Sequence, residues 1–133
     1  MKDVIIIGGG PAGILCAAAI KENAKEMVNV TIVERLEKIG KKILATGNGK
    51  CNFTNKNLSP RRYNNPKFVT PTLSKYGYKE IVEYLESIGL LSKEISEGRM
   101  YPYTESATTV LEVMRMHLNR LGVTVKTNYE VNK

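Results

Sequence analysis

Hydrophobic and polar positions near the amino terminus predict a strand, a helix and a second strand. Residues 3–7 form a short β-branched run without polar alternation, which is typical of a strand that is covered on both faces. Residues 11–26 predict a helix, with a proline in its first turn and small residues where it must pack closely on the strand. Residues 29–35 predict the second strand. This is a βαβ unit, and we expect residues 3–7 to be the central strand of a parallel sheet.

The middle of the chain loses this regular pattern and then regains it. Residues 40–65 hold many Gly, Asn, Lys and Pro residues, so we expect a long loop rather than a regular element. Helical signals return at Pro66, and residues 78–89 place apolar side chains on one helical face before a terminal glycine. We therefore expect two short helices between residues 66 and 89.

The last third predicts a hairpin, a helix and a third strand. Residues 93–106 contain two β-like runs around a Glu97-Gly98 turn. Ser106 is expected to cap a helix over residues 107–122, which carries an apolar stripe, and residues 123–131 return to strand. A βαβ start, an insertion and a third strand form only the first part of a doubly wound sheet. We therefore expect a truncated chain, whose exposed sheet edges could produce a homodimer.

Composition and charge narrow the class of protein. The 133 residues are 42% hydrophobic and 25% charged, as expected for one globular domain. The formal charge of +7 should attract anions such as phosphates, a dinucleotide or nucleic acid. The two cysteines match neither a zinc-binding spacing nor a secreted disulfide framework, so we expect a reducing cytoplasm and no metal site.

No part of the sequence predicts a membrane segment or a cleaved leader. Lys2 and the apolar run after it imitate a signal peptide, but Gly8, Gly9, Gly10 and Pro11 interrupt the run at its centre. No segment reaches the roughly 18 apolar residues that are needed to span a bilayer. We therefore expect a soluble protein.

A glycine motif lies between the first predicted strand and the first predicted helix. The segment GGGPAG satisfies G-x-G-x-x-G through Gly8, Gly10 and Gly13. Gly8 can form the tight turn, Gly10 allows a pyrophosphate to approach the backbone, and Gly13 lets the helix press against the strand. The free N–H groups of the helix start, which includes Pro11 and Ala12, would then bind the phosphates.

An acidic residue at the end of the second predicted strand supports this dinucleotide-binding hypothesis. Glu34 follows Gly13 by the spacing at which a carboxylate accepts hydrogen bonds from ribose hydroxyls. Arg35 beside it could recognise the 2′-phosphate of NADP, but Glu34 repels such a phosphate and favours an unphosphorylated ribose. The motif itself does not separate FAD from NAD.

Four segments resemble one bacterial flavoprotein family over nearly the whole chain. They are DVIIIGGGPAG, VTIVERLEKIGKKILATGNGKCNFTN, GRMYPYTESATTVLEVM and GVTVKTNYEV. They are similar to the N-terminal third of NAD(P)/FAD-dependent oxidoreductases, also called aminoacetone-oxidase and BaiN-like flavoproteins, in the glutathione-reductase-like group. The resemblance implies an α/β, partial Rossmann-like FAD/NAD(P)-binding fold with a central parallel sheet, a helical insertion and a small β-hairpin. Residues 1–133 would form the N-terminal part of the FAD-binding domain, with about residues 40–105 inserted between its second and third strands.

The resemblance also implies FAD as the cofactor and NAD(P)H as an electron donor of the complete protein, with an unknown small-molecule substrate. It places residues 47–52 on the flavin side of FAD. Independently of the family, glycines in this segment free the backbone for close approach, asparagines supply donors and acceptors, and Lys42 and Lys50 offset phosphate charge. A disordered surface loop is the alternative. The candidate cofactor-binding residues are Gly8, Gly10, Pro11, Ala12, Gly13, Glu34, Arg35, Lys42, Gly47, Asn48, Gly49, Lys50, Cys51, Asn52 and Val131.

No residue is assigned to catalysis. Cys51 has no second cysteine at a dithiol spacing, so we expect a single thiol near the flavin. Cys16 is expected to be a buried packing residue and His117 a structural one at the edge of an apolar stripe. Arg99 could bind an anion and Tyr101 or Tyr103 could face a substrate, but a packed hairpin explains these three residues equally well.

Two alternative functions stay open. One is a noncatalytic dinucleotide-binding domain. The other is a nucleic-acid-binding module, because basic and aromatic residues that can bind phosphates and stack on bases alternate within residues 56–68. No known nucleic-acid-binding motif accompanies them, which makes this alternative the less favoured one. Its residues are Lys56, Arg61, Arg62, Tyr63, Lys67 and Phe68.

Overall fold

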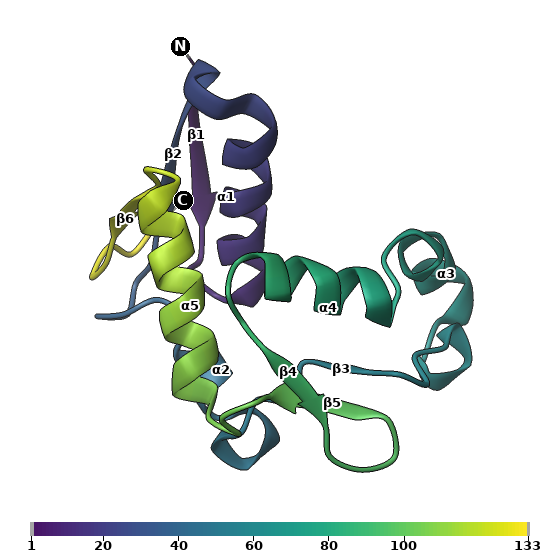
Figure 1. Ribbon diagram of the computed structural model, residues 1–133. Coiled ribbons are helices and arrows are strands. Elements are labelled where there is room, and N and C mark those ends of the chain that lie inside the picture. Colours follow the sequence, from purple (N-terminus) through teal and green to yellow (C-terminus); the bar gives the residue numbers. More distant parts are fainter. Residues whose placement is uncertain (1, 133) are drawn as a thin grey trace.

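A parallel sheet in the order β1-β2-β6 forms the centre of the structure, a computed structural model that describes residues 2–132 (Figure 1). Strand β1 (Lys2–Ile7) pairs with β2 (Val28–Val33) along its whole length, and β2 pairs with β6 (Thr124–Lys126). Helix α1 (Pro11–Ala24) connects the first two strands, and a 3₁₀ turn over Lys25–Met27 follows it. The predicted βαβ unit is therefore confirmed.

The position of β1 differs from the prediction. Strand β2 lies at the centre of the sheet, and among the described residues no strand pairs with the outer edge of β1. One face of β1 is also open, since Ile5 and Ile7 are 66% and 69% exposed. The prediction that this strand is central and covered on both faces is therefore wrong for this chain. The β-branched run indicates a strand suited to burial, but it does not indicate whether the third strand pairs with β1 or with β2.

The insertion between β2 and β6 is more regular than its composition predicts. Residues 40–65 contain the short helix α2 (Lys41–Leu44), 3₁₀ turns at Thr46–Gly49 and Pro60–Arg62, and the short strand β3 (Thr54–Asn55). The prediction of a loop without regular elements is therefore wrong for parts of this range.

The two predicted helices and the hairpin of the insertion are confirmed. Helices α3 (Pro66–Lys75) and α4 (Tyr78–Ser87) follow each other, and α4 ends just before Gly89, which adopts a positive φ of 105°. Strands β4 (Ser92–Glu94) and β5 (Arg99–Pro102) form the antiparallel hairpin. Strand β3 pairs with β5 as well, which makes a second sheet in the order β3-β5-β4.

Helix α5 (Ala107–Arg120) leads from the hairpin back to the parallel sheet. Ser106 stands at its N-cap position as predicted, but its side chain makes no capping hydrogen bond; its carbonyl oxygen accepts from the N–H of Thr109 at 3.1 Å. Strand β6 is much shorter than the predicted 123–131. The chain after it stays beside β2, because the N–H of Tyr129 donates to the carbonyl of Glu34 at 3.0 Å.

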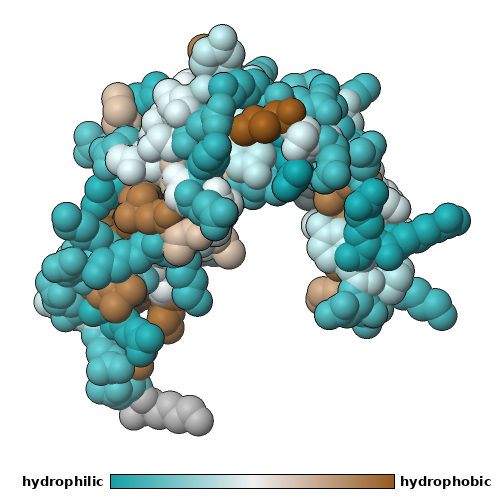
Figure 2. Space-filling view, turned by 90° about the horizontal axis from the view of Figure 1, so that it is seen from below, coloured by the Kyte–Doolittle hydropathy of each residue, from teal (hydrophilic) through white to brown (hydrophobic). Residues whose placement is uncertain are grey.

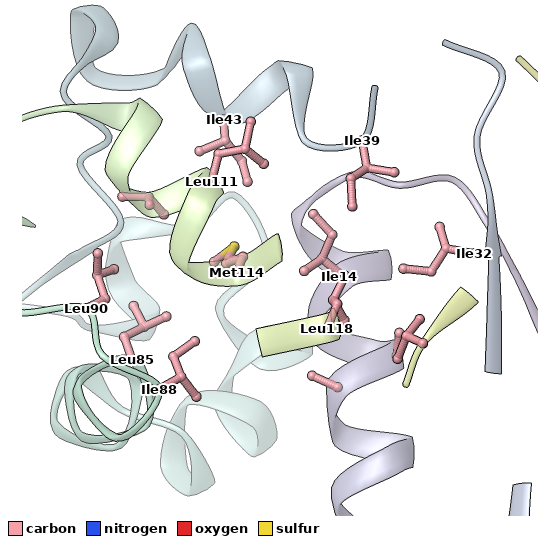
Figure 3. Packing of buried hydrophobic residues seen from close by; sticks show 14 of the residues in the cluster. Ile14, Ile32, Ile39, Ile43, Leu85, Ile88, Leu90, Leu111, Met114 and Leu118 are labelled. Atoms are coloured by element: carbon pink, nitrogen blue, oxygen red, sulfur yellow. The ribbon is translucent and has the colours of Figure 1, made fainter. Parts of the chain in front are cut away.

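The hydrophobic core lies between α1, α4, α5 and the inner face of β2 (Figure 3). Ile14 of α1 and Ile32 of β2 are almost completely buried, and Leu118 of α5 packs into the same cluster. Leu85 and Ile88 bring α4 to this core, as its apolar face predicts. No helix within residues 2–132 combines the length and the apolar character that crossing a bilayer requires.

Replacing Gly13 by alanine tests the close packing of α1 on the β1 turn. A Cβ atom there would lie 2.0 Å from the carbonyl oxygen of Gly8, which is backbone and cannot rotate away. We expect Gly13→Ala to lower the free energy of unfolding by about 1–3 kcal/mol, the usual cost of overpacking, in urea denaturation. Gly10→Ala is the matched control, because a Cβ at Gly10 meets no atom within 4 Å. An equal loss in both variants would contradict this explanation.

Candidate functional site

The turn between β1 and α1 brings the ends of the first two strands together. Gly8 adopts a φ of 101°, and its N–H donates to the carbonyl of Val33 at 2.8 Å. Gly9 donates its N–H to Oε2 of Glu34, also at 2.8 Å. Gly10 is the N-cap of α1 in an extended conformation, with Pro11 at the first helical position. The turn therefore joins the start of the helix to the end of β2.

The glycines of the motif have separable reasons to be glycine. Gly8 needs its positive φ, and Gly13 has no room for a Cβ, so both predicted structural roles are confirmed. Gly9 has no room for a Cβ either, because that atom would lie 2.3 Å from Cγ2 of Ile39. The G-x-G-x-x-G motif does not predict a glycine at this position. A Cβ at Gly10 would meet no atom within 4 Å. The space in front of Gly10 is therefore open for a ligand that approaches the helix N-terminus.

Glu34 follows β2 and is held by backbone donors on both sides. Its Oε2 accepts from Gly9, and its Oε1 accepts from the N–H of Leu36 at 2.9 Å. The hydrogen bond from Leu36 is the largest cause of a lowered pKa of this carboxyl; the Gly9 bond and the charge of Arg35 add to it, and partial burial opposes it. The carboxylate is therefore ionised at neutral pH, and each oxygen keeps acceptor capacity for a hydroxyl group.

A polar cleft of about 450 Å³ surrounds this turn and the start of α2. Four of its lining side chains are basic and come from the stretch that follows β2, which suits a diphosphate. The sequence did not single out Lys38 and Lys41 among them, nor Tyr129 on the opposite wall. The candidate residues that line this cleft are Gly8, Gly10, Glu34, Arg35, Lys42 and Val131.

The segment 46–52 folds back on itself through left-handed backbone conformations. Gly47, Asn48, Gly49 and Cys51 all have φ values between 53° and 79°. The N–H of Cys51 donates to the carbonyl of Thr46 at 3.0 Å, which closes the fold-back. Residues 47–50 are exposed, so their backbone is accessible to a ligand.

The two lysines that were predicted to offset phosphate charge lie in different places. Lys42 lines the polar cleft, whereas Lys50 lies outside it and pairs with Glu105, with Nζ 2.8 Å from Oε2. Glu105 also pairs with Lys93 at 2.8 Å, and hydrogen bonds from these two lysines lower the pKa of its carboxyl to about 2. The side chain of Lys50 thus joins the segment 46–52 to the hairpin.

The two cysteines lie in opposite environments. Cys51 is 6% exposed and belongs to the core, and burial raises the pKa of its thiol. Cys16 is exposed, so the prediction of a buried packing residue is wrong. The buried face of α1 is formed instead by Ile14, Ala17 and Ala18.

An apolar groove of about 520 Å³ lies on the other side of the α1 N-terminus. It is bordered by α1, α4, α5 and the segment 46–53. Pro11, Cys51 and Asn52 of the candidate set line it; Ala12 is exposed and lines neither space. With its amide nitrogen turned toward the β3-β5-β4 sheet, the side chain of Asn52 donates to the carbonyls of Thr54 and Met100 at 2.9 and 3.1 Å. Two adjacent residues, Gly10 and Pro11, therefore line the polar cleft and the apolar groove respectively.

His117 has the structural position that its place in the stripe predicts. Its Nε2 lies 2.7 Å from Oε1 of Glu22, and the hydroxyl of Tyr84 donates to the same oxygen at 3.2 Å. These contacts join α5, α1 and α4, and the sequence had not indicated Glu22 as the shared partner. Burial, followed by the Glu22 charge, raises the pKa of Tyr84 to about 12.

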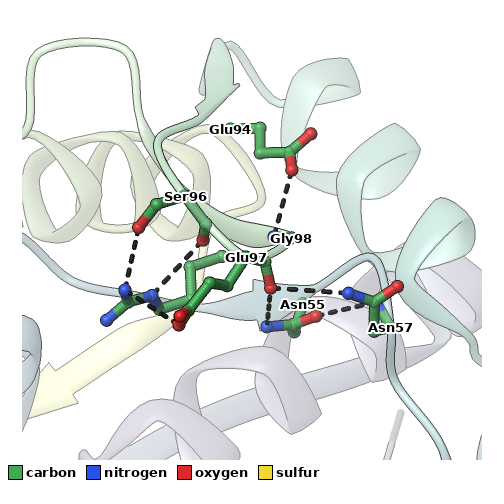
Figure 4. Close-up of polar contacts among 7 residues, drawn as sticks. Asn55, Asn57, Glu94, Ser96, Glu97 and Gly98 are labelled. Atoms are coloured by element: carbon green, nitrogen blue, oxygen red, sulfur yellow. Dashed lines mark hydrogen bonds and ion pairs between the residues drawn. The ribbon is translucent and has the colours of Figure 1, made fainter.

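Two of the three hairpin candidates, Arg99 and Tyr103, contact other residues of the hairpin, and Figure 4 shows the polar contacts around its turn. The guanidinium of Arg99 donates to the side-chain oxygen of Ser96 at 2.8 Å and pairs with Glu97 at 3.2 Å. Lys93 lies over the ring of Tyr103, with its Nζ 5.2 Å from the centroid. These contacts support the packed-hairpin explanation.

The fold and the turn together define a dinucleotide-binding Rossmann domain. The model of one family, described as "HI0933-like protein Rossmann domain", matches residues 2–133, and the chain belongs to this family. This agrees with the flavoprotein resemblance of its motifs.

Characterised relatives share sequence with the chain over almost all its length. It is 41% identical over 133 residues to a 3-dehydro-bile acid delta(4,6)-reductase of Clostridium scindens, covering 98% of this chain and 32% of that protein. It is 33% identical over 134 residues to a ribosomal RNA dihydrouridine synthase of Haemophilus influenzae, with coverages of 99% and 32%. The crystal structure of Thermovibrio ammonificans THI4 superposes with a TM-score of 0.59 at 22% identity, covering 95% of this chain and 38% of that one. The chain thus spans about a third of the length of these curated relatives.

Thiol reactivity should distinguish the two cysteines. The thiolate is the reactive form, and Cys51 is both buried and raised in pKa, whereas Cys16 is exposed. We expect iodoacetamide at neutral pH to modify Cys16 at least about tenfold faster than Cys51, measured by intact-protein mass spectrometry. Cys16→Ser should remove the fast phase and Cys51→Ser the slow one. Fast modification of the Cys16→Ser variant would contradict the buried position of Cys51.

Proposed function

We propose that this chain is the FAD-binding part of a flavin-dependent oxidoreductase, with NAD(P)H as electron donor and with the catalytic groups outside these 133 residues. The observation that carries the proposal is the open backbone cradle at Gly10, with the ionised Glu34 in the same cleft. We further propose a cytoplasmic location, which is supported by the two free cysteines.

The residues present fit the parts of FAD. A Cβ at Gly10 would meet no atom within 4 Å, and the fourteen-residue helix α1 begins at the next residue. The N-terminal dipole and free N–H groups of α1 can therefore stabilise a diphosphate. Lys38 and Lys42 add positive charge on the cleft wall. Glu34 can accept hydrogen bonds from the adenosine ribose, and its charge disfavours a 2′-phosphate at this position.

The second space favours FAD over a cofactor that needs only the polar cleft. The apolar groove begins at Pro11 and includes Asn52 of the segment that we assign to the flavin side. When bound, FAD supplies reversible hydride transfer, while the protein supplies binding, orientation and exclusion of water. The exposed backbone of residues 47–50 and the apolar groove are the parts of this chain suited to those tasks.

The names of the relatives support a more specific reaction class. The Δ4,6-reductase acts on a 3-oxo steroid acid, and a dihydrouridine synthase yields a reduced pyrimidine base. In both cases the reduced carbon–carbon double bond is conjugated with a carbonyl group. We therefore propose reduction of such a double bond, in which one carbon receives a hydride, the other a proton, and NAD(P)H is oxidised.

Flavin binding tests the cofactor proposal. We expect Gly10→Ala to weaken FAD binding at least about tenfold, or roughly 1.4 kcal/mol, because its Cβ would project into the phosphate space. Glu34→Ala should also weaken it, and Glu112→Ala is the matched control, since Glu112 is an exposed carboxylate on α5 that pairs with Arg115, and neither residue lines the cleft. Quenching of FAD fluorescence on titration with the protein gives the dissociation constants. Equal affinity of the Glu34 and Glu112 variants would reject the ribose assignment.

Turnover of the complete polypeptide tests the reaction class. We expect anaerobic NAD(P)H oxidation to depend on an added α,β-unsaturated ketone and to yield the saturated ketone by mass spectrometry. The matching saturated ketone is the control and should support no oxidation. Tight FAD binding without turnover of any conjugated substrate would favour the noncatalytic dinucleotide-binding alternative.

A further inference from the structure

One segment of the chain holds nearly all of its excess positive charge. We define the basic lobe as residues 56–79, which include the 3₁₀ turn at Pro60–Arg62 and helix α3. The rest of the chain carries 14 basic and 13 acidic residues, so six of the seven excess positive charges belong to the lobe. The lobe contains no Asp or Glu; its basic residues are Lys56, Arg61, Arg62, Lys67, Lys75 and Lys79.

The basic lobe projects away from the parallel sheet. One end of α4 lies near α1, and α3 lies at its other end (Figure 1). The surface is hollowed between the arm that carries α3 and the rest of the molecule (Figure 2). No residue of α3 is buried. Packing of the core therefore does not explain the side chains that α3 presents.

Most of the charge of the lobe is not neutralised. Lys56 pairs with Glu94 at 2.6 Å. The other five basic side chains form no ion pair with any acidic residue in the described part of the chain, and Glu80, the next acidic residue along the chain, follows directly after Lys79. Grouped, unpaired cations raise the local concentration of polyanions.

The basic lobe also carries exposed aromatic rings. Phe68 is 79% exposed although it has no polar atom to be solvated, and Tyr63 and Tyr76 are 41% and 52% exposed. The Nζ of Lys75 lies 5.3 Å from the ring centroid of Tyr76. Exposed aromatic rings among unpaired cations can stack on bases while the cations bind phosphates.

We propose that the basic lobe binds single-stranded nucleic acid, with Arg61 and Arg62 on phosphates and Phe68 stacked on a base. A single strand is favoured over a duplex because stacking requires unpaired bases. A membrane surface is disfavoured because Val69 and Leu73 of α3 are partly buried, which leaves Phe68 as its exposed large apolar side chain, and because the helix contains Pro71. Tyr76 also lines the apolar groove, so the proposed surface is continuous with that groove.

Salt dependence of binding tests the phosphate contacts. The probe is a fluorescein-labelled single-stranded oligouridylate RNA, followed by fluorescence anisotropy over a series of sodium chloride concentrations. We expect the double variant Arg61→Gln/Arg62→Gln to reduce the slope of log affinity against log salt by about 1.4, since each phosphate contact on a single strand contributes about 0.7. Lys2→Gln/Lys126→Gln removes the same charge from exposed positions outside the lobe and should leave the slope unchanged.

Base stacking is tested separately. Phe68→Ala should weaken RNA binding about tenfold without changing the salt slope, because stacking of a base on the ring releases no phosphate counterions. Tyr103→Ala is the matched control, because Tyr103 is 65% exposed but lies in the hairpin. Unfolding curves of all variants should coincide with that of the unaltered chain, since the altered side chains are exposed.

Several results would overturn the proposal. They are equal slopes in the two double variants, unchanged affinity of Phe68→Ala, or equal binding of inorganic polyphosphate, which has no bases. Binding to phosphatidylserine vesicles but not to RNA would indicate a membrane surface instead. A DNA oligonucleotide of the same length shows whether the sugar matters. Gly10→Ala should bind RNA normally, so failure of the FAD proposal and failure of this one are distinguishable.

Discussion

The hydrogen bonds around Gly9 are the constraint on which the rest of the structure depends. Its N–H donates to Glu34, and its carbonyl accepts from the N–H of Gly40 at 2.7 Å. The backbone of one residue thus connects the first turn, the end of β2 and the start of the insertion. Because a side chain at Gly9 would collide with Ile39, this connection requires a bare backbone. The polar cleft is shaped by the same contacts that hold the βαβ unit together.

Local patterns predicted the elements well and their long-range relations poorly. The βαβ unit, the hairpin and α5 follow from residues close in sequence, and Gly8, Gly10 and Glu34 follow from the spacing of a motif. The edge position of β1 depends instead on β6, which pairs with β2 and follows the whole insertion along the chain. The prediction that Cys16 is buried failed because apolar residues occur on all sides of α1, so their periodicity does not indicate which face of the helix is buried. No local signal connects Lys50 with Glu105, which lies 55 residues away.

The insertion gives the chain two surfaces of different chemistry. Its first part consists of α2 and the segment 46–53. Helix α2 lines both the polar cleft and the apolar groove, and the segment 46–53 lines the groove. Its next part, the basic lobe, contributes no buried residue from α3 and carries most of the net charge. The turn of the βαβ unit thus lines the polar cleft, while the insertion contributes walls of the apolar groove and the whole basic lobe.

The ion pairs of Glu105 determine how the attachment of the segment 46–52 to the hairpin depends on pH and salt. Its carboxylate is held by Lys50 and Lys93, and its pKa of about 2 keeps it ionised in all but strong acid. These pairs contribute above the ordinary pKa of a carboxyl group and are lost only as the pH falls toward 2. Both are solvent-accessible, so dissolved ions weaken them readily. Ionic strength, rather than mild acidity, should therefore loosen the tether between this segment and the hairpin.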